Sequence, residues 1–494
     1  MKKTIGIILG GALALALTAG CAFSPAAEAA EKIASAVSGA AGTARDAETA
    51  LLTDPDVSVT ERDASGEYDV SGATALSPDG DLTITEAGVY LLSGAYENRM
   101  ITVDAGEEDK VQLVLDNAVI TNENGPAIFV RSADKVFLTA AAGTVNTISD
   151  GSDYALTDGD TELDAAVFSR DDLTINGAGS LTINGNCKHA VVSKDDLVVT
   201  AEDLTVNAAN VGLCGRDSVR FSAAAVRITA GSDGVRSDND TDAARGYVSV
   251  VDSSLSIVSG NDGIQAETAF LAENAEISVT AGGGSGAGGG DASESSKGVK
   301  AGTGVTVSGG SWRIDALDDA VHTNGSIRID GGTFTLLSGD DAVHADEKAE
   351  IAGGTLDITA REGIEATYVL ISGGDITIRA SDDGINAARK SSAYTPTVEI
   401  SGGTVTITMG AGDTDGVDSN GDILITGGTV SVSGNSAFDY DGSVTFTGGT
   451  VYINGQQVST IPNQMMGGFG GAPGMQGGFG GAPGGFGGGP DRRF

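Results

Sequence analysis

The sequence is poor in basic, aromatic and sulfur-containing residues. It has 28 lysines and arginines against 68 aspartates and glutamates, with three histidines, three cysteines and one tryptophan. The formal net charge of −40 excludes nucleic acid as a general partner, because two polyanions repel each other. Any anionic ligand would therefore need a bridging cation.

Long apolar runs are also scarce, and the one that stands out lies at the N-terminus. Two lysines precede the run from Ile5 to Leu17, and the tetrapeptide TAGC, which ends at Cys21, follows it. This order is typical of an export signal that ends in a lipoprotein cleavage box, so it predicts a signal peptide over residues 1–20 and a lipid on Cys21. The alternative is cleavage after Ala29, which would give a secreted protein.

No later apolar segment is as long as a membrane span, so we expect membrane contact only through the lipid and a location outside the cytoplasm, at the cell surface.

The regions next to the two chain ends have simple compositions. Residues 21–79 are rich in alanine, serine and acids, which predicts a flexible spacer. Residues 461–494 repeat GGFGGAPG, a composition that cannot form a core and predicts a disordered tail.

Glycine, in contrast, is abundant, with 75 residues, and much of it marks an internal repeat. Units of about 21 to 22 residues each contain three strand-like pieces and no helical pattern, which predicts an all-β parallel β-helix with three strands per coil over residues 80–460. A double-glycine turn precedes a threonine-led apolar strand in many units. These turns are Gly309-Gly310, Gly331-Gly332, Gly353-Gly354, Gly373-Gly374, Gly402-Gly403, Gly427-Gly428 and Gly448-Gly449.

Alternation along each strand predicts which side chains face the core. Phe334 should point inward, while Thr333 and Thr335 should point outward. Trp312 occupies the same column as Phe334, so we expect it in the core and not in a sugar-stacking platform. Any stacking on sugars would then come from scattered tyrosines. These are Tyr368, Tyr394 and Tyr440.

The same alignment bears on the two cysteines that follow the N-terminal region. A cysteine pair in an exported protein can form a disulfide. Cys187 and Cys214 lie on neighbouring coils but five positions out of register, which is too far along the strand for a bridge without distortion. We therefore expect two free thiols, with the disulfide as the alternative.

One slot of the repeat reads acid, small residue, aliphatic residue and polar residue. The small residue permits a tight bend, and the aliphatic residue anchors the strand in the core. Because neighbouring coils lie about 4.8 Å apart, the first residues of the slots would stack into a column of carboxylates, interrupted once by a lysine. The slots are Asp233-Gly234-Val235-Arg236, Asp262-Gly263-Ile264-Gln265, Lys297-Gly298-Val299-Lys300, Asp319-Ala320-Val321-His322, Asp341-Ala342-Val343-His344, Glu362-Gly363-Ile364-Glu365, Asp383-Gly384-Ile385-Asn386 and Asp415-Gly416-Val417-Asp418.

Stacked carboxylates repel each other by roughly 3 to 4 kcal/mol per neighbouring pair at an effective dielectric constant of about 20. Bound Ca²⁺ would relieve this repulsion, because hard oxygen ligands on adjacent coils suit calcium. The alternative is that these acids cap turns by accepting backbone N–H bonds. The predicted calcium ligands are Asp233, Asp238, Asp240, Asp262, Asp319, Asp341, Glu362, Glu365, Asp383, Asn386, Asp415 and Asp418.

Basic side chains on this face are candidate contacts for an acidic polysaccharide. His322 and His344 share one outward position on adjacent coils, and we interpret them as stacked polar residues, with a metal pair as the alternative. His189 stands alone, so the sequence predicts no zinc site. The candidate polysaccharide contacts are Arg236, Lys297, Lys300, His322 and His344.

Several segments together resemble a family of exported bacterial carbohydrate-binding β-helix proteins that look like polysaccharide lyases and include a cellulose- and pectin-binding member. The resemblance covers roughly residues 80–460 and implies a right-handed, single-stranded, pectate-lyase-like β-helix, bound calcium and a plant-type or other acidic polysaccharide as partner. Val211 stands where the family pattern has aspartate, which puts a calcium site on that coil in doubt. The matching segments are Val111–Asp116, Gly125–Ile128, Ser169–Ile175, Ser193–Leu197, Gly234–Asp240 and Ser296–Ala301.

Three functions remain open at this point. The sequence has no evident nucleophile or acid/base pair, so we expect no catalytic residues. We expect calcium-dependent binding of an acidic, pectin-like polysaccharide, or of cellulose. We also expect the protein to be a monomer. One alternative is a calcium-dependent polysaccharide lyase in which Lys297 or Lys300 abstracts a proton from a uronate. The other is a structural stalk or adhesin at the cell surface.

Overall fold

The computed structural model describes residues 57–80, 82–155, 162–287, 295–411 and 414–463. All of them belong to a unit that begins at Asp56. The predicted signal peptide, the predicted lipid site Cys21 and the glycine-rich tail after residue 463 lie outside the described residues. In the described part, no helix is both long and apolar enough to cross a membrane.

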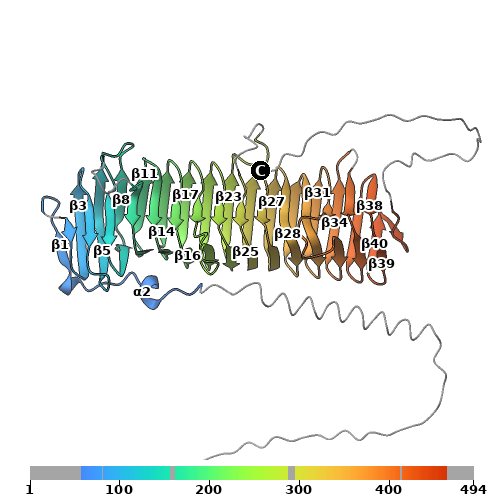
Figure 1. Ribbon diagram of the computed structural model, residues 1–494, viewed down its shortest axis with the longest axis horizontal. Coiled ribbons are helices and arrows are strands. Elements are labelled where there is room, and N and C mark those ends of the chain that lie inside the picture. Colours follow the sequence, from blue (N-terminus) through green and yellow to red (C-terminus); the bar gives the residue numbers. More distant parts are fainter. Residues whose placement is uncertain (1–56, 81, 156–161, 288–294, 412–413, 464–494) are drawn as a thin grey trace, which may run out of the picture. The chain divides into compact units, whose positions relative to one another are not determined.

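The chain forms a parallel β-helix, as the repeat predicts, in which successive coils lie side by side (Figure 1). Each coil contributes strands to three parallel ladders, which we call the first, second and third ladders. Along the chain, the acidic-slot strand of the third ladder comes first in each repeat, and the strands of the first and second ladders follow it. The strands of the first ladder are β1 (Thr74–Leu76), β3 (Gly88–Tyr96), β5 (Lys110–Asn122), β7 (Lys135–Ala140), β10 (Asp172–Asn176), β13 (Asp196–Val199), β16 (Ser218–Ser222), β19 (Tyr247–Val251), β22 (Ala269–Glu273), β25 (Gly304–Ala316), β27 (Ser326–Ser338), β28 (Asp341–Ile351), β30 (Glu362–Ile371), β33 (Thr397–Ile400), β36 (Asp422–Ile425) and β39 (Val444–Phe446).

The second ladder shares β3, β5, β25 and β27 with the first, because these long strands run through the turn between the two. Its other strands are β8 (Val145–Asp150), β11 (Ser180–Gly185), β14 (Asp203–Ala208), β17 (Ala225–Ala230), β20 (Ser254–Ser259), β23 (Glu276–Ala281), β29 (Thr355–Ala360), β31 (Asp375–Ala380), β34 (Thr404–Met409), β37 (Thr429–Ser433) and β40 (Thr450–Ile453). The last strand, β41 (Gln456–Val458), pairs with β40 in the antiparallel direction and ends the ladder.

The third ladder carries the predicted acidic slots and shares β28 and β30 with the first. Its other strands are β2 (Thr83–Ile84), β4 (Ile101–Asp104), β6 (Ile128–Ser132), β9 (Ala165–Ser169), β12 (His189–Ser193), β15 (Leu213–Gly215), β18 (Val235–Ser237), β21 (Ile264–Ala266), β24 (Val299–Ala301), β26 (Val321–Thr323), β32 (Ile385–Ala387), β35 (Asp415–Ser419) and β38 (Ser436–Tyr440).

The core consists of inward-facing side chains that stack from coil to coil. Trp312 is buried in the column of Phe334, as predicted, and the two rings are stacked with centroids 5.5 Å apart. The register also pairs Val192 with Cys214, which leaves Cys187 five positions away from Cys214 along the strand. Both cysteines are free thiols, as expected.

Residues 57–79 differ from the spacer that the sequence predicts, because they lie against the β-helix. The segment contains α2 (Glu61–Ala64), the short 3₁₀ helix η1 (Val70–Gly72) and strand β1. Asp63 of α2 is buried, with Oδ1 2.7 Å from Lys135 Nζ on β7 and 2.6 Å from Thr174 Oγ1 on β10. These contacts are polar and come from single residues, so they leave no periodic signal in the sequence.

Candidate ligand-binding face

The predicted slots form two aligned columns of side chains along the third ladder. The register aligns Asp341 with Glu362, and it aligns the aliphatic residues that follow the other slots. The slot column is Asp233, Asp262, Lys297, Asp319, Asp341, Glu362, Asp383 and Asp415. The companion column, one residue after the inward aliphatic residue, is Arg236, Gln265, Lys300, His322, His344, Glu365, Asn386 and Asp418.

On the coils before Asp233, the companion column consists of buried apolar side chains. It continues backwards through Cys214, Val192, Phe168 and Phe129, which pack in a hydrophobic cluster separate from the main core. Val211 belongs to this cluster and is fully buried, so the coil that departs from the family pattern offers no ligand oxygen from this slot. The polar face therefore begins at β18.

On the first polar coil, the structure brings together only two of the predicted calcium ligands Asp233, Asp238 and Asp240. The Arg236 guanidinium lies 3.4 Å from Asp233 Oδ2 through Nη1 and 3.6 Å from Asp238 Oδ2 through Nε, so it joins these two acids. Asp240 is exposed and forms no ion pair within the described part of the chain. Arg236 thus relieves the charge at this end, and Asp240 stays outside the cluster.

The two lysines of these columns, Lys297 and Lys300, form ion pairs with acids. Lys297 Nζ lies 2.6 Å from Asp318 Oδ2 and 2.7 Å from Asp319 Oδ2. Burial would lower the pKa of Lys297, but the attraction of Asp319 and hydrogen bonds to both acids raise it overall. Lys300 lies 3.5 Å from Asp262. A general base must be neutral to accept a proton, so Lys297 fits charge relief better than catalysis.

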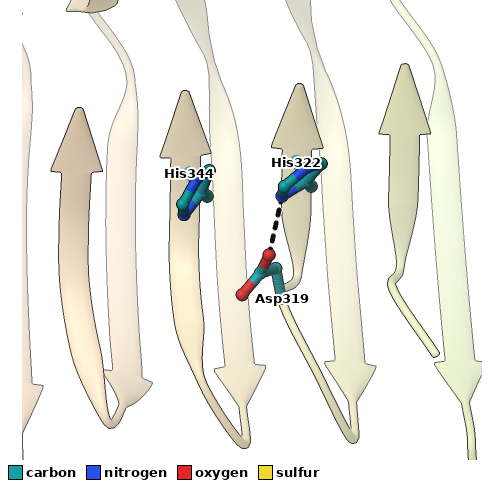
Figure 2. A group of neighbouring side chains, drawn as sticks. All are labelled: Asp319, His322 and His344. Carbon is teal, nitrogen blue, oxygen red and sulfur yellow. Dashed lines mark hydrogen bonds and ion pairs between the residues drawn. The ribbon is translucent and has the colours of Figure 1, made fainter. Parts of the chain in front are cut away.

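The histidines stack on adjacent coils, as the register predicts. Figure 2 shows the His322 and His344 rings side by side on neighbouring strands, with Asp319 bonded to His322. The ring centroids lie 4.6 Å apart and the ring planes are inclined by 21°. His322 Nδ1 donates to Asp319 Oδ2 at 2.8 Å, and His344 Nδ1 donates to Asp341 Oδ2 at 2.7 Å. Each histidine therefore contacts the acid of its own slot, and His344 Nδ1 also lies 3.1 Å from Glu365 Oε2.

These pairs separate the pKa values of the acids around them. Burial would raise the pKa of Asp319, but hydrogen bonds from His322 and Lys297 hold it well below its usual range. Burial, only partly offset by His344, together with the charges of Asp319 and Glu365, raises the pKa of Asp341. The centre of the face is thus a network of paired charges.

Glu362 and Glu365 also have partners, two of which the repeat does not reveal. Arg361 lies 2.9 Å from Glu362, and Lys390 lies 2.9 Å from Glu365. Asn386 Nδ2 donates to Glu362 at 3.0 Å and to Glu365 at 3.3 Å. Asn386 Oδ1 is buried and has no hydrogen-bond partner among the described residues. Lys390 belongs to the loop between β32 and β33, which is not part of the repeat. The repeat therefore gives no indication that Lys390 contacts Glu365.

Turn capping, the alternative to calcium, accounts for one oxygen of several slot acids. Each of these oxygens accepts the backbone N–H of the slot residue one coil further on, at 2.8 to 3.3 Å. The pairs are Asp233 with Asp262, Asp262 with Lys297, Asp319 with Asp341, and Asp383 with Asp415. The second oxygen of Asp233, Asp262 and Asp319 already meets Arg236, Lys300 and Lys297, respectively. Asp383 has no such partner among the described residues.

Near the C-terminal end of the columns, two acids, Asp383 and Asp418, differ from those at the centre. Within the residues that the structure describes, neither Asp383 nor Asp418 pairs with a lysine, arginine or histidine. Burial and the charge of Asp418 raise the pKa of Asp383 to about 7. Burial and the charges of Asp415 and Asp439 raise the pKa of Asp418 to about 6. For these two acids, no cation of the protein within the described residues relieves the carboxylate repulsion.

Two of the tyrosines predicted for sugar stacking form a pair near the face. The Tyr368 and Tyr394 rings have centroids 5.5 Å apart and planes inclined by 45°. Tyr368 Oη donates to Glu399. Both rings are partly exposed, and Tyr394 belongs to the same loop as Lys390. A role in sugar binding stays a prediction.

Comparison with known proteins identifies a family of carbohydrate-binding domain-containing proteins. Residues 78–342 and 338–459 match a family model described as carbohydrate-binding domain-containing protein. A protein of that description from Acetivibrio thermocellus is 35% identical over 204 residues, which cover 41% of this chain and 71% of the relative. The solved gadolinium derivative of a polysaccharide lyase-like protein from C. thermocellum is 36% identical, with a TM-score of 0.40, and the match covers 41% of this chain and 82% of that one.

Proposed function

Because the chain belongs to the family of carbohydrate-binding domain-containing proteins, we propose that it binds an acidic polysaccharide along the third ladder through calcium, without catalysis. Equivalent positions on successive coils suit a polymeric ligand, because each coil offers the next sugar a similar contact. The observation that carries the proposal is the pair Asp383 and Asp418, which lack a cation of the protein within the described residues.

The calcium ion would lie between the coils of β32 and β35. Asn386 and Asp418 are aligned there. The Asn386 amide nitrogen points back to Glu362 and Glu365, so its unpartnered oxygen lies on the opposite side of the amide. Calcium takes six to eight oxygen ligands, from carboxylates, amide oxygens and water. Asn386 and the neighbouring acids can supply part of this shell, and a uronate carboxylate can complete it.

Basic residues at the other end of the face would contact the polysaccharide directly. The side chains of Arg236 and Lys300 are 28% and 33% exposed. Lys297 and His344 are more deeply buried and ion-paired, so they would act through their charge on the column. Bridging by calcium at one end and direct contact at the other would hold an acidic chain along the ladder despite the net charge of −40.

The proposal is tested by co-sedimentation of the full chain with insoluble polygalacturonate in excess calcium and in chelator. We expect calcium-dependent binding without unsaturated uronate products in the ultraviolet. The double variant Asp383→Asn with Asp418→Asn should weaken binding by at least about tenfold, because two ligand charges are lost. The control is Asp357→Asn, since Asp357 lies exposed on the second ladder and pairs with Arg379.

Binding that survives the chelator, or that the double variant retains in full, would contradict the calcium bridge. A parallel assay with cellulose separates an acidic from a neutral ligand. Equal binding to both polysaccharides with chelator present would reject the acidic ligand as well.

A further inference from the structure

Four basic residues occupy equivalent positions on successive coils, at the C-terminal ends of β6, β9, β12 and β15 in the third ladder. The register aligns the residues that directly precede them, and each of the last three donates its backbone N–H to the previous coil at 2.9 to 3.0 Å. We call this set the basic column, and its members are Arg131, Arg170, Lys194 and Arg216. With 28 basic against 68 acidic residues in the chain, an unbroken run of basic residues is the opposite of what the composition favours.

The basic column lies on the same face as the companion column. Its members each come two residues after a companion-column residue, and side chains two apart along a strand point to the same face. Because neighbouring coils lie about 4.8 Å apart, the basic column is roughly 14 Å long. The next residue in the same position is Asp238, which lies 3.6 Å from Arg236. The basic column therefore ends where the polar part of the companion column begins.

Aromatic rings hold three of these side chains at the surface. The guanidinium carbons of Arg131 and Arg170 lie 5.2 and 5.4 Å from the ring centroid of Phe129. Lys194 Nζ lies 5.4 Å from the ring centroid of Phe168. A cation within about 6 Å of an aromatic face is attracted by the ring. Both rings are buried, while all four basic residues are partly or fully exposed, so the positive charges are held in place at the surface.

Two acids that directly follow basic-column residues have another partner. Asp195 follows Lys194, and Asp217 follows Arg216. Arg245 Nη1 lies 3.8 Å from Asp195 Oδ1 and forms a closer ion pair with Asp217. Within the part of the chain that the structure describes, neither Lys194 nor Arg216 forms an ion pair with an acid. Relief of the charge on these acids therefore does not explain half of the basic column.

The other two members of the basic column form exposed ion pairs. Arg131 Nη1 lies 3.2 Å from Asp104 Oδ2, and Arg170 Nη2 lies 2.9 Å from Glu162 Oε1. The four side chains of these pairs are 33% to 63% exposed. Exposed ion pairs contribute little to stability. A carboxylate of a ligand can therefore replace the acid of the protein at small cost.

From this geometry we propose that the basic column binds carboxylates of the acidic polysaccharide directly, without a bridging cation. The inference rests on the proposed function, because it adds a second contact region for the same polymer. Arginine can donate two parallel N–H bonds to one carboxylate, and lysine supplies a point charge.

The distance between the two regions decides which ligands can use both. The calcium ligands around β32 lie roughly 34 Å further along the third ladder than β15, at about 4.8 Å per coil. One polymer chain can reach both regions, whereas a short oligosaccharide cannot. Two joined contacts on one ligand bind more strongly than either contact alone. The basic column adds to the calcium contacts and does not replace them.

Binding of a long and a short ligand by the full chain in excess calcium tests the basic column. The double variant Lys194→Gln with Arg216→Gln removes the two charges that have no acid partner in the described structure. It should bind polygalacturonate roughly fivefold or more weakly, because two charge-assisted contacts to the polymer are lost. Its calcium-dependent binding of trigalacturonate, which is too short to join the two regions, should equal that of the wild type. The difference for the polymer should shrink as sodium chloride is added, because salt screens exposed charges.

The matched control is the double variant Arg313→Gln with Arg379→Gln, which removes the same charge from exposed positions on the second ladder. It should bind both ligands as the wild type does. Equal polymer binding by the two double variants would overturn the inference, and so would an equal loss of polymer and of trigalacturonate by the Lys194 and Arg216 variant.

The same data separate the two proposals. If the wild type binds neither ligand in calcium, the proposed function fails and this inference fails with it. If the wild type binds both ligands and the two double variants agree, only this inference fails.

Discussion

Single carboxylates of this chain differ in pKa according to the cation that each one meets. Burial alone would raise the pKa of Asp63, but hydrogen bonds from Lys135 and Thr174 lower it to about 2. Asp383 lies beside Asp418 without such a partner, and its pKa rises to about 7. Both acids can be identified from the sequence. The sequence does not reveal which side chain lies next to each acid in the fold, and that side chain decides the direction of the pKa shift.

Asp63 allows a test of stability at the residue scale. Asp63→Asn should destabilise the fold by roughly 3 kcal/mol, because it leaves the Lys135 charge buried without its partner. In the wild type, the contribution of Asp63 is complete above the ordinary pKa of 3.8 and is lost as the pH falls towards 2. Chemical denaturation of both proteins should therefore differ at neutral pH and converge near pH 2.

The exposed neighbour Glu61 gives the matched control, since Glu61→Gln alters the same helix without touching the buried pair. If Asp63→Asn unfolds at the same denaturant concentration as Glu61→Gln at neutral pH, the ion pair has no role in holding residues 57–79 on the β-helix.

At the scale of strands and turns, the repeat determines what can be predicted. The alignment of Trp312 with Phe334 follows from spacing alone, because each coil places equivalent residues in one column. Contacts that leave the repeat could not be predicted. Lys390 reaches Glu365 from a loop, and residues 57–79 contact the coils from β5 to β16 through single polar contacts. Neither set of contacts recurs with the period, so neither produces a pattern.

The double-glycine turns give a test at this scale. Gly332 has a φ of +113°, and a Cβ there would lie 3.0 Å from the carbonyl carbon of Gly309, whereas a Cβ on Gly331 would meet nothing within 4 Å. Gly332→Ala should therefore cost about 1 to 2 kcal/mol. Gly331→Ala should stay within about 0.5 kcal/mol of the wild type. Thermal unfolding measures both, and equal midpoints for the two variants would show that the turn tolerates a side chain at either position.

Across the whole molecule, the third ladder divides into a buried apolar stretch, a stretch of paired charges and a stretch in which Asp383 and Asp418 pair with no cation among the described residues. The slot pattern predicts the columns. It cannot predict the division, because the covering residues and the cations Arg361 and Lys390 come from outside the slots. The division matters for function because it leaves Asp383 and Asp418 without a cation of the protein among the described residues.

The most direct test is an anomalous difference map from crystals of the full chain grown with calcium. We predict an ion between the coils of β32 and β35, about 2.3 to 2.6 Å from Asn386 Oδ1 and from carboxylate oxygens of the neighbouring acids. A map with no ion there, in which Asn386 Oδ1 is hydrogen-bonded and the Asp383 and Asp418 oxygens contact only water or main-chain amides, would contradict the account.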